Sequence, residues 1–384
     1  MNLQRIKKEL INVTKLLIQT PSFSGQEKDV ADILVCKMKQ LQYDEVIIDD
    51  IGNVIGIIKG KNHKASILFT THMDHVPPGE RAEWLFDPFQ GVIEGDYIYG
   101  CGAADAKGAL ATQLFIKLIL KNVHEHGDIF VAFTVGEEVG GFGSQYLIKN
   151  ADLPPPRFAI IGEPSNNELR NGHRGRAIVK ILLKGKRTHS SRCLPEENVF
   201  FICSRLVAKL FQCDWPRASL GATSVIPVSC THELCPLNIT PSWLALKCDC
   251  RIIPEQSLSD VVRILETLIP NRVLVEIENF TFKSYTGLEF QAPMHPAFWI
   301  SPTHPVLQTV QSALEQNFKR DFPIRTWQFT TDAGIFAQKG IITIGFAPGD
   351  EKCVHSANER ISISEMVDAL AYYFNIIQTL SAIK

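Results

Sequence analysis

The sequence predicts an α/β fold in which a mostly parallel sheet, covered by helices on both faces, is interrupted by a smaller α+β domain. Short apolar runs alternate with helical patterns over residues 1–175, the order changes over 176–287, and the first pattern returns over 288–384. Apolar runs that alternate with helices are typical of a parallel sheet whose two faces are buried. A length of 384 residues also suits two domains better than one.

The first segment shows the clearest alternation. Apolar residues between Leu3 and Leu17 recur at helical spacing and predict an N-terminal helix. Ser24 and Glu27 have the spacing of a capping box, which predicts that a second helix begins there. The strands expected after it lie at 46–48, 54–58, 67–70, 129–135 and 158–161, and the helices at about 105–121 and about 142–149.

The middle segment has a different order of elements. Strands are expected at 176–185, 243–252 and 273–282, and helices at about 197–212 and 257–268. Elements in this succession are typical of a small α+β domain of the ferredoxin-like type. The first pattern then resumes, so the small domain is predicted to be inserted into the large one. The resuming elements are a helix at 304–318, a strand at 341–346 and a helix at 364–379.

The composition disfavours several classes of function. The 39 basic and 41 acidic side chains leave a net charge of −2, which gives no electrostatic reason to expect nucleic acid or an anionic membrane as a partner. No apolar stretch approaches the roughly 18–20 residues of a membrane span. The first residues lack the apolar segment of a secretory signal, so a cytoplasmic location is expected. The ten cysteines form no CxxC pair and are expected to be free thiols, with a metal site at Cys230, His232 and Cys235 as a minor alternative.

Residues that can bind metals or transfer protons follow four of the expected strands. The carboxyl ends of parallel strands form one edge of a sheet, where ligands bind, so these side chains are expected to meet in one crevice. They are His72 and Asp74, Glu137 and Glu138, Glu163, and His355 on the loop beyond the fourth strand, with Asp105 joining them from the start of a helix. Such a cluster of acids would repel itself without cations.

Each of these residues has a simpler interpretation when it is considered alone. His72 would be a structural histidine, Asp105 a helix N-cap, Glu137 and Glu138 a solvated pair at a helix start, Glu163 a turn residue and His355 a solvent-exposed loop residue. Together, two histidines and three carboxylates suit a pair of Zn²⁺, Co²⁺ or Mn²⁺ ions with one carboxylate bridging them. One more carboxylate is then needed to take the proton of the attacking water, and Asp74 could orient the imidazole of His72.

Rival motifs are weak. The segment Gly100-x-Gly102-x-x-Asp105 nearly matches a dinucleotide-binding loop, but an aspartate replaces the third glycine and would repel a pyrophosphate. The sequence contains no GxxxxGK[ST] phosphate loop and no GxSxG nucleophile elbow. A nucleotide-dependent enzyme and a serine hydrolase are therefore disfavoured.

Ordered motifs extend this constellation over nearly the whole chain. They include Thr71-His72-Met73-Asp74, Gly102-Ala-Ala-Asp105, Gly136-Glu137-Glu138, Gly162-Glu163-Pro164, Gly172-His-Arg-Gly-Arg176, Asp249-Cys-Arg251 and the segment from Gly349 to Glu359. In this order they resemble the co-catalytic metallopeptidases of the M20 family, which includes acetylornithine deacetylase and succinyl-diaminopimelate desuccinylase. The HRGR segment and Pro296-Ala-Phe-Trp299 are most similar to a subgroup of hydrolases linked by name to selenium metabolism. Cys101, where relatives often have arginine, and Ala347, in place of a glycine, depart from the family pattern.

The resemblance implies a set of metal ligands and a proton shuttle. Asp105 would bridge two divalent metal ions, His72 and Glu163 would complete one site, and Glu138 and His355 would complete the other. Glu137 matches the general base of the family, and Asp74 matches the residue that supports His72. Zn²⁺ is the metal expected first, with Co²⁺ and Mn²⁺ as alternatives.

The resemblance also implies how a substrate and a second copy of the chain bind. The inserted domain would act as a lid and dimerisation domain in a homodimer, where His189 reaches across to stabilise the oxyanion in the other subunit. Asn238 and Arg251 match positions that handle substrate, and Arg174 and Thr330 are candidates for binding a substrate carboxylate. The expected reaction is hydrolysis of the amide bond of a small N-acyl amino acid. Alternatives are a dipeptidase, carboxypeptidase or N-carbamoyl-amino-acid hydrolase on the same site, and a ligand-binding protein that retains the fold.

Overall fold

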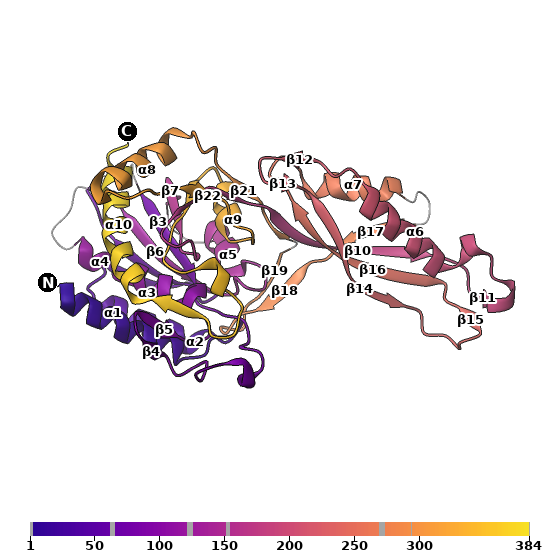
Figure 1. The fold of residues 1–384 in the computed structure, drawn as a ribbon, viewed down its shortest axis with the longest axis horizontal. Helices are drawn as coiled ribbons and strands as arrows, with labels where there is room; N and C mark the ends of the chain where they lie inside the picture. Colours follow the sequence, from indigo (N-terminus) through magenta and orange to yellow (C-terminus); the bar gives the residue numbers. More distant parts are fainter. Residues whose placement is uncertain are drawn as a thin grey trace.

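An eight-stranded sheet forms the centre of the larger part of the molecule (Figure 1). The structure is a computed structural model that describes residues 3–61, 66–120, 126–150, 154–268, 273–292 and 294–383. The strands follow the order β1 (Glu45–Ile48), β2 (Val54–Ile58), β6 (Ile129–Thr134), β3 (Ile67–His72), β7 (Phe158–Ile161), β23 (Ile342–Gly345), β8 (Leu169–Arg170) and β22 (Ile324–Arg325). The consecutive strands β6, β3, β7 and β23 are parallel, whereas β1, β2 and β6 pair antiparallel at one edge. The predicted mostly parallel sheet is confirmed.

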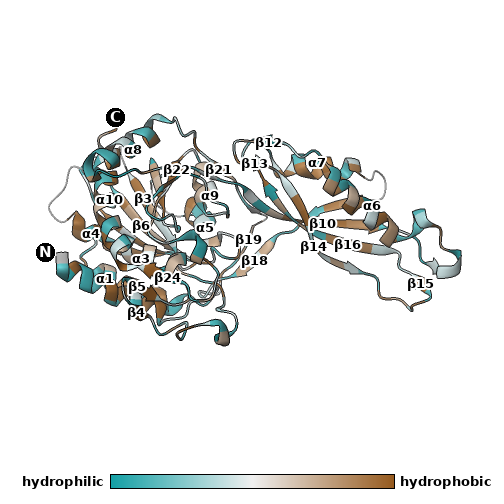
Figure 2. Ribbon diagram, in the orientation of Figure 1, coloured by the Kyte–Doolittle hydropathy of each residue, from teal (hydrophilic) through white to brown (hydrophobic). Residues whose placement is uncertain are grey.

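Both faces of the central strands β2, β6, β3 and β7 are buried, as their continuous apolar runs predict. Alternate side chains of one strand enter two separate cores, so that Phe69 lies in the first core and Leu68 in the second. Figure 2 shows hydrophobic residues along the central strands. The helices over the first core are α1 (Leu3–Ile18), α2 (Lys28–Gln40), α3 (Gly108–Leu114), α4 (Ile116–Ile119), α8 (Pro305–Phe318) and α10 (Ile363–Ser381). Those at the second core are α5 (Phe142–Asn150) and α9 (Ala333–Ala337).

Two local predictions in this part are wrong. The capping box does not form, because Ser24 Oγ donates to Asp74 Oδ2 at 2.6 Å and Glu27 Oε1 accepts from the Gly136 N–H. Both side chains have buried partners from the site, which compete successfully with the backbone of α2. The helix expected at about 105–121 is also interrupted, since Asp105 and Ala106 have non-helical backbone angles within the turn Ala103–Lys107 that precedes α3, and α4 follows as a separate turn.

A four-stranded antiparallel path forms the smaller part, which extends away from the large sheet in Figure 1. Its order is β14 (Ser224–His232), β16 (Trp243–Ile252), β10 (Gly175–Lys184) and β17 (Val273–Ile277), and the short β20 (Met294–His295) also pairs with β10. Side chains of α6 (Val199–Gln212) and α7 (Leu258–Leu268) pack on alternate residues of these strands. The predicted α+β character is confirmed. At the far end lies a two-stranded pair, β11 (Thr188–His189) and β15 (Ile239–Thr240).

A hairpin returns the chain from the small part to the large one. The strand expected at 273–282 ends at Ile277, and β18 (Phe280–Lys283) then pairs with β19 (Glu289–Ala292). Phe282 stacks on Phe142 with ring centroids 5.1 Å apart, in the core of the large sheet. Residues 280–283 of β18 fall within the range 176–287 expected for the insert, yet Phe282 packs in the core of the larger part.

The remaining short strands lie at the rim of the large part and beside the junction. They are β4 (Val92–Glu94), β5 (Tyr97–Tyr99) and β24 (Arg360–Ser362) in one small sheet, the pair β9 (Gly172–His173) and β21 (Phe298–Trp299), and the pair β12 (Arg217–Ala218) and β13 (Gly221–Ala222). Within the described ranges, no helix has the length and apolar character needed to cross a membrane.

Candidate metal centre

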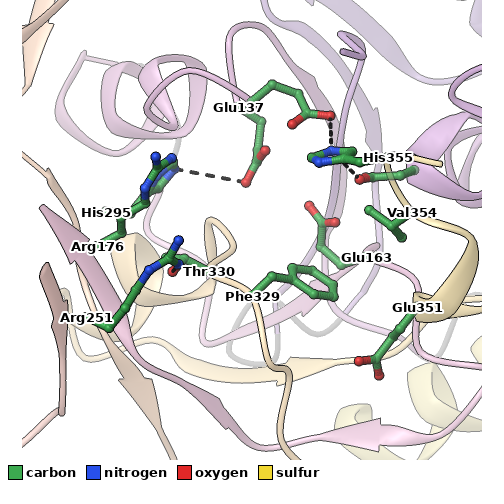
Figure 3. A pocket seen from close by; sticks show the side chains of 12 residues that line it. Glu137, Glu163, Arg176, Arg251, His295, Phe329, Thr330, Glu351, Val354 and His355 are labelled. Atoms are coloured by element: carbon green, nitrogen blue, oxygen red, sulfur yellow. Dashed lines mark hydrogen bonds and ion pairs between the residues drawn. The ribbon is translucent and has the colours of Figure 1, made fainter. Parts of the chain in front are cut away.

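The carboxyl ends of the parallel strands bring the predicted ligands together. His72 is the last residue of β3, Glu163 follows β7, and Glu137 and Glu138 follow β6. The loop beyond β23 carries His355, and the turn before α3 carries Asp105. Figure 3 shows Glu137, Glu163 and His355 pointing into one pocket. The crevice predicted at this edge of the sheet is therefore present.

The carboxylate of Asp105 lies between the two histidines. Its Oδ1 is 2.9 Å from His72 Nε2, and its Oδ2 is 3.2 Å from His355 Nε2. On the first side, Glu163 Oε1 lies 3.6 Å from His72 Nε2, and on the second, Glu138 Oε1 lies 3.1 Å from His355 Nε2. The five side chains thus form two half-sites that share one carboxylate.

The orientation of the His72 ring fits metal binding. Its Nδ1 lies 2.9 Å from the backbone oxygen of Asp74, an acceptor only, so Nδ1 carries a hydrogen and Nε2 is the ring nitrogen that faces the cluster, where a metal ion would take the place of the proton that Nε2 donates to Asp105. The Asp74 carboxylate accepts from the N–H groups of Glu137 and Glu138 at 3.1 and 3.3 Å and from Ser24 Oγ. Asp74 therefore connects the His72 strand end to the loop that carries Glu137 and Glu138.

The centre gathers more negative charge than its imidazoles can balance. Burial, and then the carboxylates of Glu163 and Asp332, hold the pKa of Glu137 well above its ordinary range. Burial likewise raises the pKa of Glu163. Burial by itself would raise the pKa of Asp105, but hydrogen bonds from His355 and His72 outweigh it, and the pKa of Asp105 is lowered. The same kind of contact acts in reverse on His355, whose hydrogen bonds to Asp105 and Glu138 raise its pKa to about 10. Divalent cations would relieve this repulsion, and the nitrogen and oxygen donors present are those that Zn²⁺, Co²⁺ and Mn²⁺ accept.

A buried glutamate fixes the turn that carries Asp105. Glu359, which is 2% exposed, accepts the backbone N–H groups of Gly102, Ala104 and Asp105 at 2.8, 2.8 and 2.9 Å. The Nζ of Lys107, just beyond this turn, donates to the backbone oxygens of Leu17 and Thr20 at 2.9 and 2.8 Å. The turn is thus tied to the chain after β23 and to the end of α1.

The pocket has a second wall of different character. We call His72, Asp105, Glu138, Glu163 and His355, the candidate ligands, the metal-binding cluster. The pocket encloses about 410 Å³ and is lined by twelve residues. Opposite the metal-binding cluster, these include Arg176, Arg251, His295, Phe329 and Thr330. Arg176 and Arg251 face each other across β10 and β16, and their Nε atoms both bind the carboxylate of Asp249, at 2.8 and 2.9 Å. Two guanidinium groups thus share one carboxylate, which leaves a net positive charge on this wall.

The predicted substrate-binding residues are distributed unevenly. Arg251 and Thr330 line the pocket, and Arg251 Nη1 donates to Thr330 Oγ1 at 3.2 Å. Arg174 is not among the lining residues, since its Nη1 donates to the backbone oxygen of Ala222 at 3.0 Å, and Arg176 lines the pocket instead. His189 and Asn238 lie side by side at the far tip of the smaller part, where Ser190 N donates to Asn238 O at 2.8 Å.

The two departures from the family pattern lie beside the centre. The thiol of Cys101 is buried 3.5 Å from His75 Nδ1, and burial raises its pKa to about 12. Ala347 is buried against Ala106 and Ala109, and its backbone N–H and oxygen both bind Ser165 Oγ at 2.8 Å. Neither residue lines the pocket.

The sequence reasoning missed three residues that face the pocket or support it. His295 and Arg176 line the pocket, and Asp332 lies behind His295 at 3.3 Å. Arg176 lies within one of the ordered motifs, but no spacing assigns it a role. In the described part of the chain, the groups of clustered donors that could hold a metal are His72 with Asp105 and Glu138, His72 with Glu137 and Glu163, and Glu137 with His295 and Asp332. Cys230, His232 and Cys235 form no such group, so the minor alternative gains no support.

Comparisons with known proteins identify the family and relatives of the chain. Residues 68–379 match the peptidase family M20/M25/M40. The chain is 26% identical over 388 residues to the Escherichia coli (strain K12) protein YgeY, covering 97% of this chain and 95% of that protein. It is 24% identical over 395 residues to succinyl-diaminopimelate desuccinylase of Blochmanniella floridana, covering 96% and 98%.

Solved structures share the fold. Aminopeptidase PepT of Bacillus cereus superposes with a TM-score of 0.75 at 22% identity, covering 99% of both chains. YXEP of Bacillus subtilis, a dinuclear metal binding peptidase from the M20 family, superposes with a TM-score of 0.74 at 15% identity, covering 99% of this chain and 100% of that one. Because the family match spans most of the chain, the protein belongs to the peptidase family M20/M25/M40 and is a metallohydrolase that acts on amide or peptide bonds.

Proposed function

We propose that this protein is a dinuclear metal-dependent amidohydrolase that cleaves the amide bond of a small N-acyl amino acid. The observation that carries the proposal is the Asp105 carboxylate, which presents one oxygen to His72 and the other to His355. Glu163 adds an oxygen on the His72 side and Glu138 adds one on the His355 side. A shared carboxylate with one imidazole and one further carboxylate on each side is suited to two ions.

The donor set favours Zn²⁺ as the bound metal, with Co²⁺ and Mn²⁺ as alternatives. When bound, the two ions would activate a water molecule and polarise the scissile carbonyl group. Asp74 keeps the His72 ring in place and holds the backbone of Glu137 and Glu138.

Glu137 moves the proton in this proposal. Its carboxylate lines the pocket beside Glu138 and Glu163 without being needed to complete either half-site. The raised pKa of Glu137, caused first by burial and then by Glu163 and Asp332, lets it hold a proton more readily than an ordinary carboxylate. A base of this kind suits removal of a proton from water and its delivery to the departing nitrogen atom.

The wall opposite the metal-binding cluster fits the anionic end of an amino acid. Arg251 supplies N–H donors, and Arg176 adds a second guanidinium beside it. Thr330 Oγ1 accepts from Arg251 Nη1 and donates to the backbone oxygen of Arg174, so Thr330 holds the arginine in place. The single carboxylate of Asp249 balances the charge of only one of the two guanidiniums, so the free carboxylate of a substrate would neutralise the other. The desuccinylase name carried by one relative agrees with an N-acyl amino acid as substrate.

The proposal includes a homodimer formed by the inserted domain, with the active site completed across the interface. The edge strand β14 and helix α6 carry much of the exposed apolar surface. Phe201 and Phe211 of α6 are 54% and 92% exposed, and Leu237 in the loop before β15 is fully exposed. His189 and Asn238 sit beside that loop, away from the pocket of their own chain. In the dimer, His189 would stabilise the oxyanion in the other subunit.

Amine release tests the proposal directly. Protein stripped of metal and refilled with Zn²⁺, Co²⁺ or Mn²⁺ is offered N-acetyl, N-succinyl and N-carbamoyl amino acids and dipeptides. Metal-dependent release from an N-acyl amino acid is the expected result, and Glu137→Gln should keep two metals per chain while turnover falls about 10²–10⁴-fold. Release from dipeptides or carbamoyl compounds alone would replace the proposed substrate class, and a fully active Glu137→Gln would contradict the proton shuttle.

A further inference from the structure

A histidine that belongs to neither half-site faces Glu137. The Nε2 of His295 lies 4.0 Å from Glu137 Oε1 and 3.3 Å from Asp332 Oδ1. Figure 3 shows this imidazole opposite the Glu137 carboxylate, on the side away from His355. His295, Glu137 and Asp332 are 9%, 8% and 4% exposed, so their interactions are weakly screened by solvent.

Three distant segments hold this arrangement. His295 belongs to β20, where it pairs with Arg176 of β10 at the junction of the two sheets. Asp332 immediately precedes α9, and its Oδ2 accepts a hydrogen bond from Ser144 Oγ of α5 at 2.5 Å. At Gly141 a Cβ atom would collide with both His295 Nε2 and Asp332 Oδ1, so the close approach of the imidazole and the carboxylate requires the glycine.

The chemistry of the three groups assigns the hydrogen. Ionised carboxylates only accept hydrogen bonds, so a ring nitrogen set between Glu137 and Asp332 must carry a hydrogen to be favourable there. Asp332 has a second partner in Ser144 and is therefore fixed from behind. The imidazole is consequently anchored on Asp332 and presents the same N–H edge to Glu137, while it separates two buried carboxylates that would otherwise repel each other.

We infer that His295 is a positioning residue for Glu137. The positive N–H edge of its imidazole, hydrogen-bonded to Asp332 and 4.0 Å from Glu137 Oε1, attracts the Glu137 carboxylate and holds it in the orientation that receives the proton of the attacking water. The inference rests on the proposed function, because it depends on the role of Glu137. It assigns His295 and Asp332 no part in binding either metal ion.

Kinetics of matched variants test this assignment. His295→Gln retains an N–H donor near the position of Nε2 and should keep most of the turnover, whereas His295→Leu should lower kcat about 10–100-fold with little change in KM. In a Glu137→Gln background His295→Leu should cause no further loss, because the imidazole then has no carboxylate to orient. His126→Leu is the control, since His126 is also buried but precedes β6, at the end remote from Glu137.

Several kinetic results would overturn the inference. One is a normal kcat in His295→Leu, and another is a raised KM with an unchanged kcat. A third is a double variant whose kcat falls by the product of the two single effects. A failure of the proposed function looks different, because wild-type protein would then release no amine from any compound in the panel.

A second measurement does not need turnover. Crystal structures of the zinc-loaded protein should show Glu137 facing position 295 in the wild type and in His295→Gln, and in another rotamer in His295→Leu. An unchanged Glu137 in His295→Leu would refute the positioning role. Metal analysis gives an independent check, because a third zinc ion per chain that disappears in His295→Leu would make His295 a ligand instead.

Discussion

Replacing Glu359 should reveal how strongly the turn that carries Asp105 depends on one buried carboxylate. Three backbone N–H groups donate hydrogen bonds to this side chain, which is 2% exposed. A buried donor left without an acceptor costs about 1–3 kcal/mol. Because Glu359→Ala leaves three such donors, it can lower the free energy of unfolding by at most about 9 kcal/mol. Water entering the vacated space would reduce this, and we expect the free energy of unfolding to fall by about 3–5 kcal/mol.

The variant Glu359→Gln separates the turn geometry from overall stability. Its amide oxygen can still accept from the N–H groups of Ala104 and Asp105. Its NH₂ group, however, would face the N–H of Gly102, which is left without an acceptor at a cost of about 1–3 kcal/mol in the free energy of unfolding. Urea unfolding gives the stability, and competition with a chromophoric chelator gives the zinc affinity, which should weaken about 10–100-fold. Glu365→Gln is the control, because Glu365 accepts only the Gly349 N–H from the backbone. A Glu359→Gln protein with wild-type stability and zinc affinity would refute the reasoning.

Three further predictions concern pH, the arginines of the second pocket wall and the dimer. Burial and then Asp74 raise the pKa of Glu27 to about 8. The folded chain therefore keeps a proton that the unfolded chain releases, and stability of the metal-free protein should fall from about pH 4.5 to about pH 8; urea unfolding should show a shallower fall for Glu27→Gln. Arg251→Ala should raise KM about 10-fold or more, measured by initial rates, with metal content unchanged. Mixing inactive His189→Ala and Glu137→Gln proteins should restore part of the activity, because a hybrid dimer contains one intact site; mixtures that stay inactive would contradict the trans role.

The convergence of the metal-binding cluster could be predicted because topology alone produces it. His72, Glu137 and Glu163 each follow a continuous apolar run, and three such runs that become neighbouring parallel strands must end at one edge. His355 and Asp105 come from loops. The sequence shows where these residues stand along the chain, but it does not show where a loop places their side chains in space. Their placement depends on contacts such as the three N–H bonds to Glu359, which appear only in the folded chain.

The failures of prediction arise where tertiary partners replace local ones. Ser24 and Glu27 match a capping pattern, yet Asp74 and the Gly136 N–H are available to them in the folded core. His295 was missed because its role depends on the register of β20 against β10 and on the space left by Gly141. Neither feature has a signature in spacing or composition. The sequence does not distinguish Arg174 from Arg176, because only the folded chain shows that Arg174 precedes β10 and donates to the backbone oxygen of Ala222, whereas Arg176 lies in β10 and lines the pocket.

The two walls of the pocket are built by different stretches of chain. The metal-binding wall belongs to the large sheet and its loops, whereas Arg176 and Arg251 belong to the strands of the small one. The two arginines are therefore encoded by a block of sequence separate from the metal ligands. A chimera that received residues 175–277 from a relative with a different ligand would exchange both arginine positions together, while Thr330 and the candidate ligands His72, Asp105, Glu138, Glu163 and His355 stayed unchanged.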